Sequence, residues 1–352
     1  MNRTELTRLI EEGELIREVD LSGMDLAGAV LSGGIFQSVS FAGANLSQAV
    51  LKESVFIETD FGAADLTGAD LTHAMMNKPK FARAKMTGAR LFMAALTAPD
   101  LSGADLTRGA LKQAVLLDAD LTGAVLKEAD LEMTVMLGAK LAEADLSEAH
   151  MTRTFLMEAD LTRAILTGAR LENAHLMNCN LSGKNLHGQH LALTQFQKSN
   201  LTGVNFMGAD LTQANFAEAD LSEARLDRVK APYALFLKAK MVRASLKDAV
   251  LTGAIFQEAD LTLADFSDSD LEQAVLSGAN GRAAVFRGAN LDCGDFSRAD
   301  LSGADFSQAT LYRTKLHRIK DEHALWTGAN RRLALGTDED RAEAEDFVFA
   351  PF

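Results

Sequence analysis

The feature that most constrains this chain is a large apolar residue at every fifth position. Steps of five from Leu21 to Leu316 give 60 positions, which we call centres, and 58 of them hold Leu, Phe or Met. The two exceptions are Ala231 and Gly281. A small residue, usually Ala, stands two positions before each centre, and no insertion or deletion interrupts the period.

A five-residue period fits neither regular element. On an α-helix, steps of about 100° per residue spread such centres around the whole cylinder. In a flat strand, an odd step sends alternate centres to opposite faces. The period fits a chain that turns a corner every five residues, so that each short extended side points its centre inward. The small residue two positions earlier then also faces the narrow interior.

The residues just before the centres show how many sides a coil has. The set that starts at residue 20 and recurs every 20 residues contains no apolar member among fifteen. The set that starts at Ile35 with the same spacing has ten apolar members among fifteen. A twenty-residue periodicity on the outside indicates four five-residue sides per coil.

These repeats resemble the pentapeptide-repeat family, whose consensus A(D/N)LXX recurs almost literally, for example at 69–71 and 259–261. The resemblance covers residues 19–330 and implies the family's fold, a right-handed quadrilateral β-helix. We therefore expect an all-β solenoid of about 15 coils.

Both ends have features of caps, which solenoids need because an open terminal coil exposes core and unpaired backbone. Residues 1–18 predict a helical cap, with Asn2 and Glu5 at capping-box spacing. Residues 331–352 predict an acidic helix after Thr337, followed by an apolar tail. The aromatic residues of this end either cover the last coil or form a dimer contact; they are Trp326, Phe347, Phe349 and Phe352.

Composition narrows the functional class. Two cysteines in 352 residues and a charged N-terminus without an apolar signal region predict a cytoplasmic protein. No apolar stretch approaches the ~20 residues that span a bilayer. The net charge of −14 disfavours direct binding to nucleic acid, which basic patches drive, but it is compatible with imitation of nucleic acid or a basic partner.

One outward set of residues predicts a contact surface for a protein. On the side that starts at Ile35, the residues before and after several centres are both apolar, which places them on one outward face. We take as its members Val115, Leu117, Val135, Leu137, Phe155 and Met157, with Leu235 and Leu237 further along the chain. Contiguous apolar surface on a soluble protein usually marks a contact site. The alternatives are β-propensity alone and coverage by the chain's own termini.

No catalytic, metal or cofactor signature is present, so we expect neither an enzyme nor a cofactor or small-molecule site. One irregular region breaks the small-residue rule, where Lys184 and Gln189 occupy inward positions beside His187 and His190. It is either a polar binding notch or a locally widened coil whose polar ends reach solvent. The histidines have no recognised metal-ligand spacing.

The sequence favours a non-enzymatic scaffold or adaptor that docks a protein partner, or a second copy as a homodimer, along its apolar side. The family resemblance implies an alternative, because some pentapeptide-repeat proteins are DNA mimics that bind DNA gyrase or topoisomerase IV and modulate quinolone action. A charged leader followed by the repeats at 20–28 also resembles modules of bacterial type VI secretion loci, which would supply a setting for the scaffold.

Overall fold

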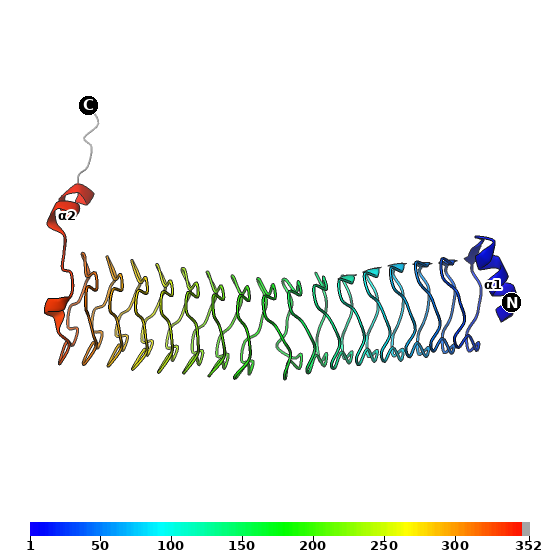
Figure 1. The fold of residues 1–352 in the computed structure, drawn as a ribbon, viewed down its shortest axis with the longest axis horizontal. Helices are drawn as coiled ribbons and strands as arrows, with labels where there is room; N and C mark the ends of the chain where they lie inside the picture. Colours follow the sequence, from blue (N-terminus) through cyan, green and yellow to red (C-terminus); the bar gives the residue numbers. More distant parts are fainter. Residues whose placement is uncertain (347–352) are drawn as a thin grey trace, which may run out of the picture. The chain divides into compact units, whose positions relative to one another are not determined.

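The computed structural model describes residues 1–346, which divide into two compact units (Figure 1). The first unit comprises residues 1–180 and the second begins at Leu181. Each unit is a stack of coils built from the five-residue repeats, and each is described by itself.

The first unit begins with helix α1, Arg3–Glu11. Its N-cap is Asn2, whose side-chain oxygen accepts a hydrogen bond from the backbone N–H of Glu5 at 3.0 Å. Leu6 is buried, and Gly13 follows the helix with a φ of +73°. The local signals in the first 13 residues are thus those of a short amphipathic helix.

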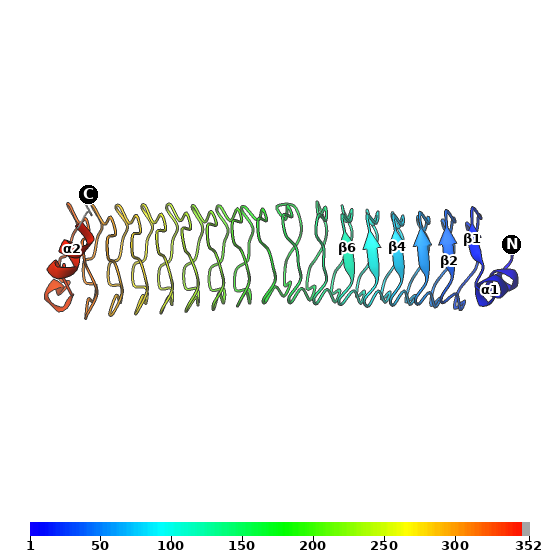
Figure 2. The same cartoon turned by 90° about the horizontal axis from the view of Figure 1, so that it is seen from above.

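Six short strands follow on one side of the first unit and form a parallel sheet in chain order (Figure 2). They are β1 (Leu15–Arg17), β2 (Ile35–Gln37), β3 (Val55–Ile57), β4 (Met75–Asn77), β5 (Ala95–Thr97) and β6 (Val115–Leu117). Each residue pairs with the residue 20 positions later. In every strand the middle residue is buried and its two neighbours face outward.

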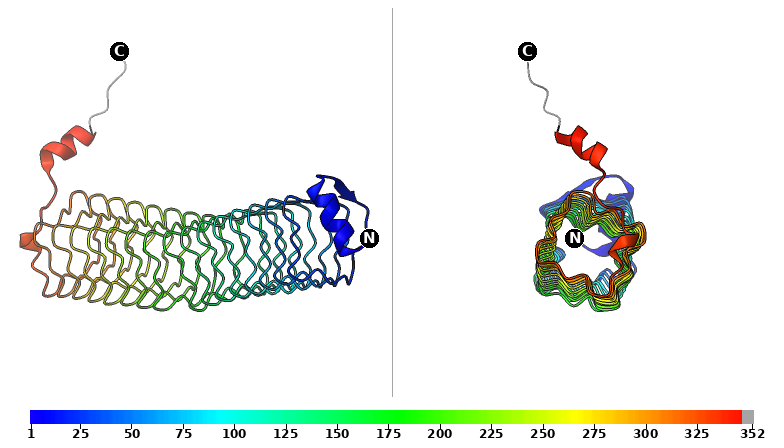
Figure 3. Two further views of the ribbon diagram at one scale, coloured as in Figure 1. Left: turned by 45° about the vertical axis from the view of Figure 1, so that its right-hand side comes forward. Right: turned by 90° about the vertical axis from the view of Figure 1, so that its left-hand side faces the viewer.

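The other sides of the coils pair through single bridges with the same offset. Asp20 pairs with Ser40 on one side, Asp25 with Asn45 on the next, and Val30 with Val50 on the third. Four five-residue sides therefore complete one coil, as the end-on view of the coils shows (Figure 3). The prediction of a four-sided β-solenoid is confirmed.

The interior is filled by the centres and by the small residues two positions before them. Almost all centres are buried, together with nearly every alanine at the small position. Phenylalanines at equivalent positions stack on one another: the rings of Phe41, Phe61 and Phe81 lie 5.2 and 4.8 Å apart and are nearly parallel. In the described coils these side chains fill the interior at the density typical of protein cores.

The corners of the coils depend on a conformation that the sequence analysis did not foresee. The residue two positions after a centre adopts a positive φ, usually between 50° and 70°. At most corners the N–H one residue later donates to the carbonyl of the centre, as Met24 does to Leu21. Many glycines occupy this corner position, and the other residues found there include no Val, Ile or Thr. Side chains branched at Cβ are those that this left-handed conformation excludes most strongly.

The second unit repeats the same coils and extends further than the regular pattern of centres. Its bridges continue to Leu325, which pairs with Asp305, and to Leu335, which pairs with Lys315. The expected count of about 15 coils, based on the centres up to Leu316, is therefore slightly low. Trp326 stacks on Phe306 in the terminal coils, with ring centroids 4.3 Å apart.

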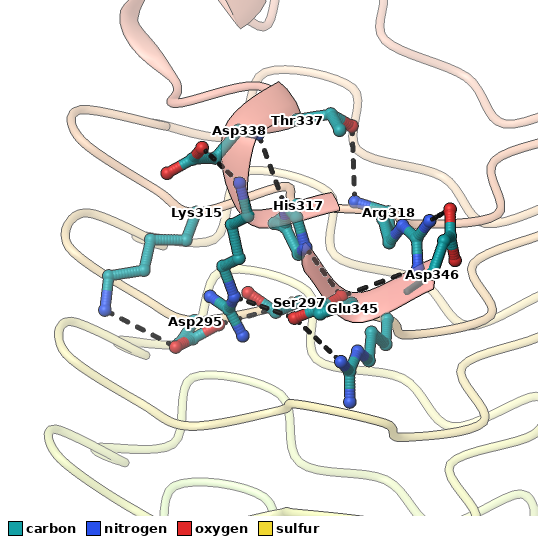
Figure 4. A network of polar contacts seen from close by, with 11 residues as sticks. Asp295, Ser297, Lys315, His317, Arg318, Thr337, Asp338, Glu345 and Asp346 are labelled. Atoms are coloured by element: carbon teal, nitrogen blue, oxygen red, sulfur yellow. Dashed lines mark hydrogen bonds and ion pairs between the residues drawn. The ribbon is translucent and has the colours of Figure 1, made fainter. Parts of the chain in front are cut away.

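Two short helices complete the described chain, the 3₁₀-helix η1 (Arg331–Leu333) and the α-helix α2 (Glu339–Asp346). A network of polar contacts attaches α2 to the second unit (Figure 4). Glu345 is its hub and pairs with Arg298 at 2.7 Å, His317 at 3.2 Å and Arg318 at 3.5 Å. Hydrogen bonds from Arg298 and His317 lower the pKa of Glu345 to about 2, so this carboxylate is ionised at neutral pH.

Candidate protein-interaction face

The predicted contact residues of the first unit lie on the side that carries β1 to β6, which we call the apolar side. β6 supplies Val115 and Leu117, and the ladder continues through bridges from Val115 to Val135 and from Val135 to Phe155. We use the name apolar ladder for the six predicted residues of this unit, Val115, Leu117, Val135, Leu137, Phe155 and Met157. The structure brings all six together on one side of three successive coils.

The side chains of the apolar ladder are half-buried rather than fully exposed. Equivalent residues in neighbouring coils cover one another, because coils stack at the spacing of β-strands, about 4.8 Å. The ring of Phe155, for example, stacks on that of His175 with centroids 4.4 Å apart. The sequence analysis placed these side chains on an outward face, and stacking between coils reduces the apolar area that each of them offers to a partner.

Strand geometry explains part of the apolar composition. The apolar side is the one on which the first six coils form three-residue strands, whereas the other sides pair through single bridges. Val55 and Ile57 of β3 suit such extended backbone. Val135 to Met157, however, follow the last strand and pair only through bridges. Strand propensity can account for Phe155, which forms parallel bridges, but not for Leu137 and Met157.

A hollow lies on the same side of the first unit, beside the apolar ladder. It has a volume of about 320 Å³ and is lined by residues of β3, β4 and β5, including Met75, Ala95 and Thr97. Met75 is 58 % exposed at its edge. The short side chains of β5 between longer neighbours form a recess into which an apolar side chain of another molecule would fit.

The two remaining predicted contact residues belong to the second unit. Leu235 and Leu237 lie on the side defined there by residues 235–237, 255–257, 275–277, 295–297 and 315–317, which we call the apolar side of the second unit. Leu235 is half-buried and Leu237 is 36 % exposed. Ile255 and Val275 follow Leu235 in the same ladder.

The polar notch has the geometry of a locally open coil. Lys184 and Gln189 are half-buried, although the small residues at equivalent positions elsewhere are almost all buried. His187 and His190 are exposed. No group of three or more His, Cys, Asp or Glu residues suited to a metal ion occurs among residues 1–346. The Lys184 side chain is therefore partly accessible to solvent.

The aspartates that stand just before the centres have a structural role. Their side-chain oxygens accept hydrogen bonds from the backbone N–H two residues later, as Asp65 does from Thr67 at 3.0 Å. Hydrogen bonds from the side chain and backbone of Thr67 lower the pKa of Asp65. Lysine and arginine from adjacent coils pair with many of these carboxylates, for example Lys240 with Asp220 at 3.1 Å. The acidic surface is thus interrupted by cations along each side.

At the C-terminal end, Trp326 is half-buried, and the guanidinium of Arg331 lies 4.8 Å from its ring centroid. The other three residues predicted for a cap or dimer contact, Phe347, Phe349 and Phe352, lie outside the described residues.

The sequence analysis missed the buried residue His317, which is 3 % exposed beneath α2. Its position just after a centre predicted an outward side chain, and only the docking of α2 buries it.

In the described part of the chain no helix is long and apolar enough to cross a membrane.

Comparison with known proteins agrees with this geometry. The profile of pentapeptide repeats matches segments that together run from residue 16 to residue 318 with short gaps. The chain belongs to the pentapeptide-repeat family. A comparison with curated proteins gives no match.

Several solved structures of pentapeptide-repeat proteins are similar to this chain. HetL, involved in heterocyst differentiation regulation in Nostoc sp. strain PCC 7120, is 24 % identical over 84 % of this chain and 96 % of its own, with a TM-score of 0.19. QnrB1, a plasmid-mediated fluoroquinolone resistance protein, is 18 % identical over 60 % of this chain and 85 % of its own, with a TM-score of 0.19. Rfr23 from Cyanothece 51142 is 21 % identical over 47 % of this chain and 92 % of its own, with a TM-score of 0.17. Sequence identities and TM-scores this low give no information about the function of this chain.

Proposed function

We propose that this pentapeptide-repeat protein is a non-enzymatic scaffold that docks a protein partner along the apolar side of its first unit. The observation that carries the proposal is the apolar ladder, six large side chains on one side of three successive coils. Water contacts part of each side chain, and a partner that covers them would remove this apolar area from water at a gain of roughly 25 cal/mol per Å².

The shape of the face supports a protein rather than a small molecule. The apolar ladder is a row of half-buried side chains, and the hollow lined by β3 to β5 is open on the same side. Interface cores are enriched in aromatic residues and methionine and depleted in charge, and the ladder contains Phe155 and Met157 without any charged member. A second copy of this chain is one candidate for the partner.

A paired set of variants tests the proposal. The double substitution Val135→Asp and Phe155→Asp places two charges in the apolar ladder. The control, Val125→Asp with Ile165→Asp, changes two apolar residues on another side of the same unit, which are separated by Asp145 in their ladder; Ile165 is 47 % exposed. Both variants should keep the circular dichroism spectrum and melting behaviour of a folded solenoid.

The readouts are affinity capture from the native lysate and the mass in solution by light scattering. We expect the ladder variant to lose a specific captured protein, or to lose self-association, whereas the control variant keeps it. If a well-folded ladder variant captures the same proteins as the wild type and keeps the same mass, the proposal is wrong.

The alternative is an acidic mimic of DNA that binds gyrase or topoisomerase IV, and the net charge of −14 favours it. Its support is weaker, because the aspartate carboxylates are engaged by backbone N–H groups and by cations of adjacent coils. Unchanged supercoiling by gyrase at micromolar concentrations of this protein would exclude this alternative. The cytoplasmic location and a bacterial type VI secretion setting remain predictions from the sequence.

A further inference from the structure

One side of the first unit lacks the backbone hydrogen bonds that join the preceding coils. One coil earlier on this side, the N–H of Leu121 donates to the Lys140 carbonyl at 2.9 Å, and the N–H of Lys140 donates to the Ala119 carbonyl at 2.9 Å. Within the first unit, no backbone hydrogen bond joins residues 138–143 to residues 157–162. Lys140 also lacks a bridge to the residue 20 positions later. The stack of coils is therefore open at this place.

The corner beside the opening is unusual as well. Of the corner residues between Gly23 and Gly328, all of them in the described part of the chain, Arg163 alone lacks a positive φ. Its guanidinium forms an ion pair with the carboxylate of Glu143, the corner residue of the preceding coil. A side-chain contact thus joins the two coils where the backbone bonds are missing.

A hollow of about 470 Å³ occupies the opening. This volume lies within the range of sites that bind small molecules or short peptide segments. Lys140, Leu141 and Ala142 line the hollow from one coil, and Glu158, Asp160 and Thr162 line it from the next. The charged side chains at the hollow have both signs, so they favour neither an anion nor a cation as the occupant.

The two backbone edges that face each other across the hollow favour an extended peptide. Each edge presents N–H and C=O groups that pair with the neighbouring coil elsewhere in the stack, and such edges bind another extended chain. The N–H of Leu141 has no acceptor among the described residues, although Leu141 is only 2 % exposed. A backbone donor that is neither paired nor hydrated is destabilising, so an occupant that accepts from it would stabilise the coil.

The hollow is continuous with the apolar ladder. Leu137 of the ladder directly precedes Gly138, and Met157 directly precedes Glu158. Gly138 and Glu158 both line the hollow. A protein that covers the ladder therefore reaches the opening across a single corner of the coil.

We propose that the partner of the apolar ladder places an extended peptide segment in this hollow, where its backbone pairs with the edges at residues 138–143 and 157–162. Five extended residues span roughly 16 Å, the length of one side of a coil. The inference rests on the proposed function for the source of the segment, and it adds backbone pairing as the mode of recognition.

A disulfide that closes the opening provides the test. In a Cys293→Ser background, Lys140→Cys with Asp160→Cys places thiols at equivalent positions of adjacent coils. Paired coils lie about 4.8 Å apart, within the Cα separation of about 4.4–6.8 Å that a disulfide requires. The control, Asp145→Cys with Ile165→Cys, forms its disulfide on the next side, where the two residues are already bridged. Ala142→Trp, which fills the hollow with a large side chain, is a second way to block it.

The probe is a phage-displayed library of random heptapeptides, panned on the wild-type chain. We expect enriched peptides that bind the oxidised 140–160 variant and Ala142→Trp at least tenfold more weakly than the wild type. Reduction of the 140–160 disulfide should restore binding, and the oxidised control should bind like the wild type. Bound peptide should slow hydrogen exchange at the amides of Leu141 and Glu143 at least tenfold.

Two results would overturn the inference: no enriched peptide, or peptides that bind the open and blocked forms equally. The proposed function fails by a different result, retained capture or self-association in the Val135→Asp and Phe155→Asp variant. The two tests use different variants and different probes, so either idea can fail alone.

Discussion

The left-handed corner of each repeat can be tested at Gly203. This residue has a φ of +65°, and a Cβ atom added there would meet no atom within 4 Å. Its N–H donates to the carbonyl of Ser222 in the next coil at 2.9 Å. Because the surroundings are open, the energetic effect of a substitution comes from the backbone conformation.

The expected change in stability on substituting Gly203 follows from two opposing effects. An L-residue in the left-handed conformation costs about 1–2 kcal/mol, whereas replacing Gly by Ala stabilises by about 0.4–1 kcal/mol through the unfolded chain. We therefore expect Gly203→Ala to destabilise its coil by about 0.5–1 kcal/mol. Gly203→Val should destabilise it by about 2 kcal/mol or more, since branching at Cβ adds steric conflict. Gly203→Asn should be closest to the wild type, because asparagine tolerates this conformation.

Native-state hydrogen exchange at the amides of Leu201 and Val204 measures the local free energy of opening. Gly336→Ala is the matched control, because Gly336 is equally open but lacks a positive φ. That control should be neutral or slightly stabilising. If Gly203→Val is no more destabilising than Gly336→Ala, the corners do not require a left-handed residue and our explanation of the missing Val, Ile and Thr fails.

Three further outcomes are expected. Phe236→Leu should cost about 1–3 kcal/mol in local exchange, because the buried ring stacks on two neighbours at 5.0 and 4.7 Å; a cost below about 0.5 kcal/mol would refute a role for stacking. The pKa of Glu345 is lowered to about 2, so its attachment of α2 should be complete above pH 4.5 and lost as the pH falls through 2; Glu345→Gln should abolish this dependence in amide exchange of α2. Thiol titration of the native chain should find Cys293 alone, since burial raises the pKa of Cys179 to about 11; two reactive thiols before unfolding would contradict the burial of Cys179.

The coil architecture was predictable because each repeat carries the same signal. The apolar centres and the twenty-residue periodicity of the outward residues together specify which residues pair, and the observed register between Ile35 and Val55 is the one expected. The left-handed corners could also have been predicted. Glycine recurs two positions after the centres, at Gly23, Gly28 and Gly33 among others, and this pattern is typical of a positive φ.

The place of α2 could not be predicted from the repeats. His317 and Ser297 have the sequence positions of outward residues, and they are buried only because a segment distant in sequence packs on them. Glu345 is one of several acidic residues in its helix, and nothing local marks it as the partner of Arg298. The degree of exposure of Phe155 likewise depends on its stacking with His175 in the next coil.

The central claim is that the apolar ladder of the first unit contacts a protein, and site-specific photo-crosslinking tests it most directly. A benzophenone amino acid replaces Leu137 in the ladder or, as control, Val125, a half-buried residue on another side of the same unit. We predict a discrete covalent protein adduct from position 137 in the native lysate, none from position 125, and loss of the adduct with Phe155→Asp. Equal labelling from both positions, or no adduct from position 137, would contradict it.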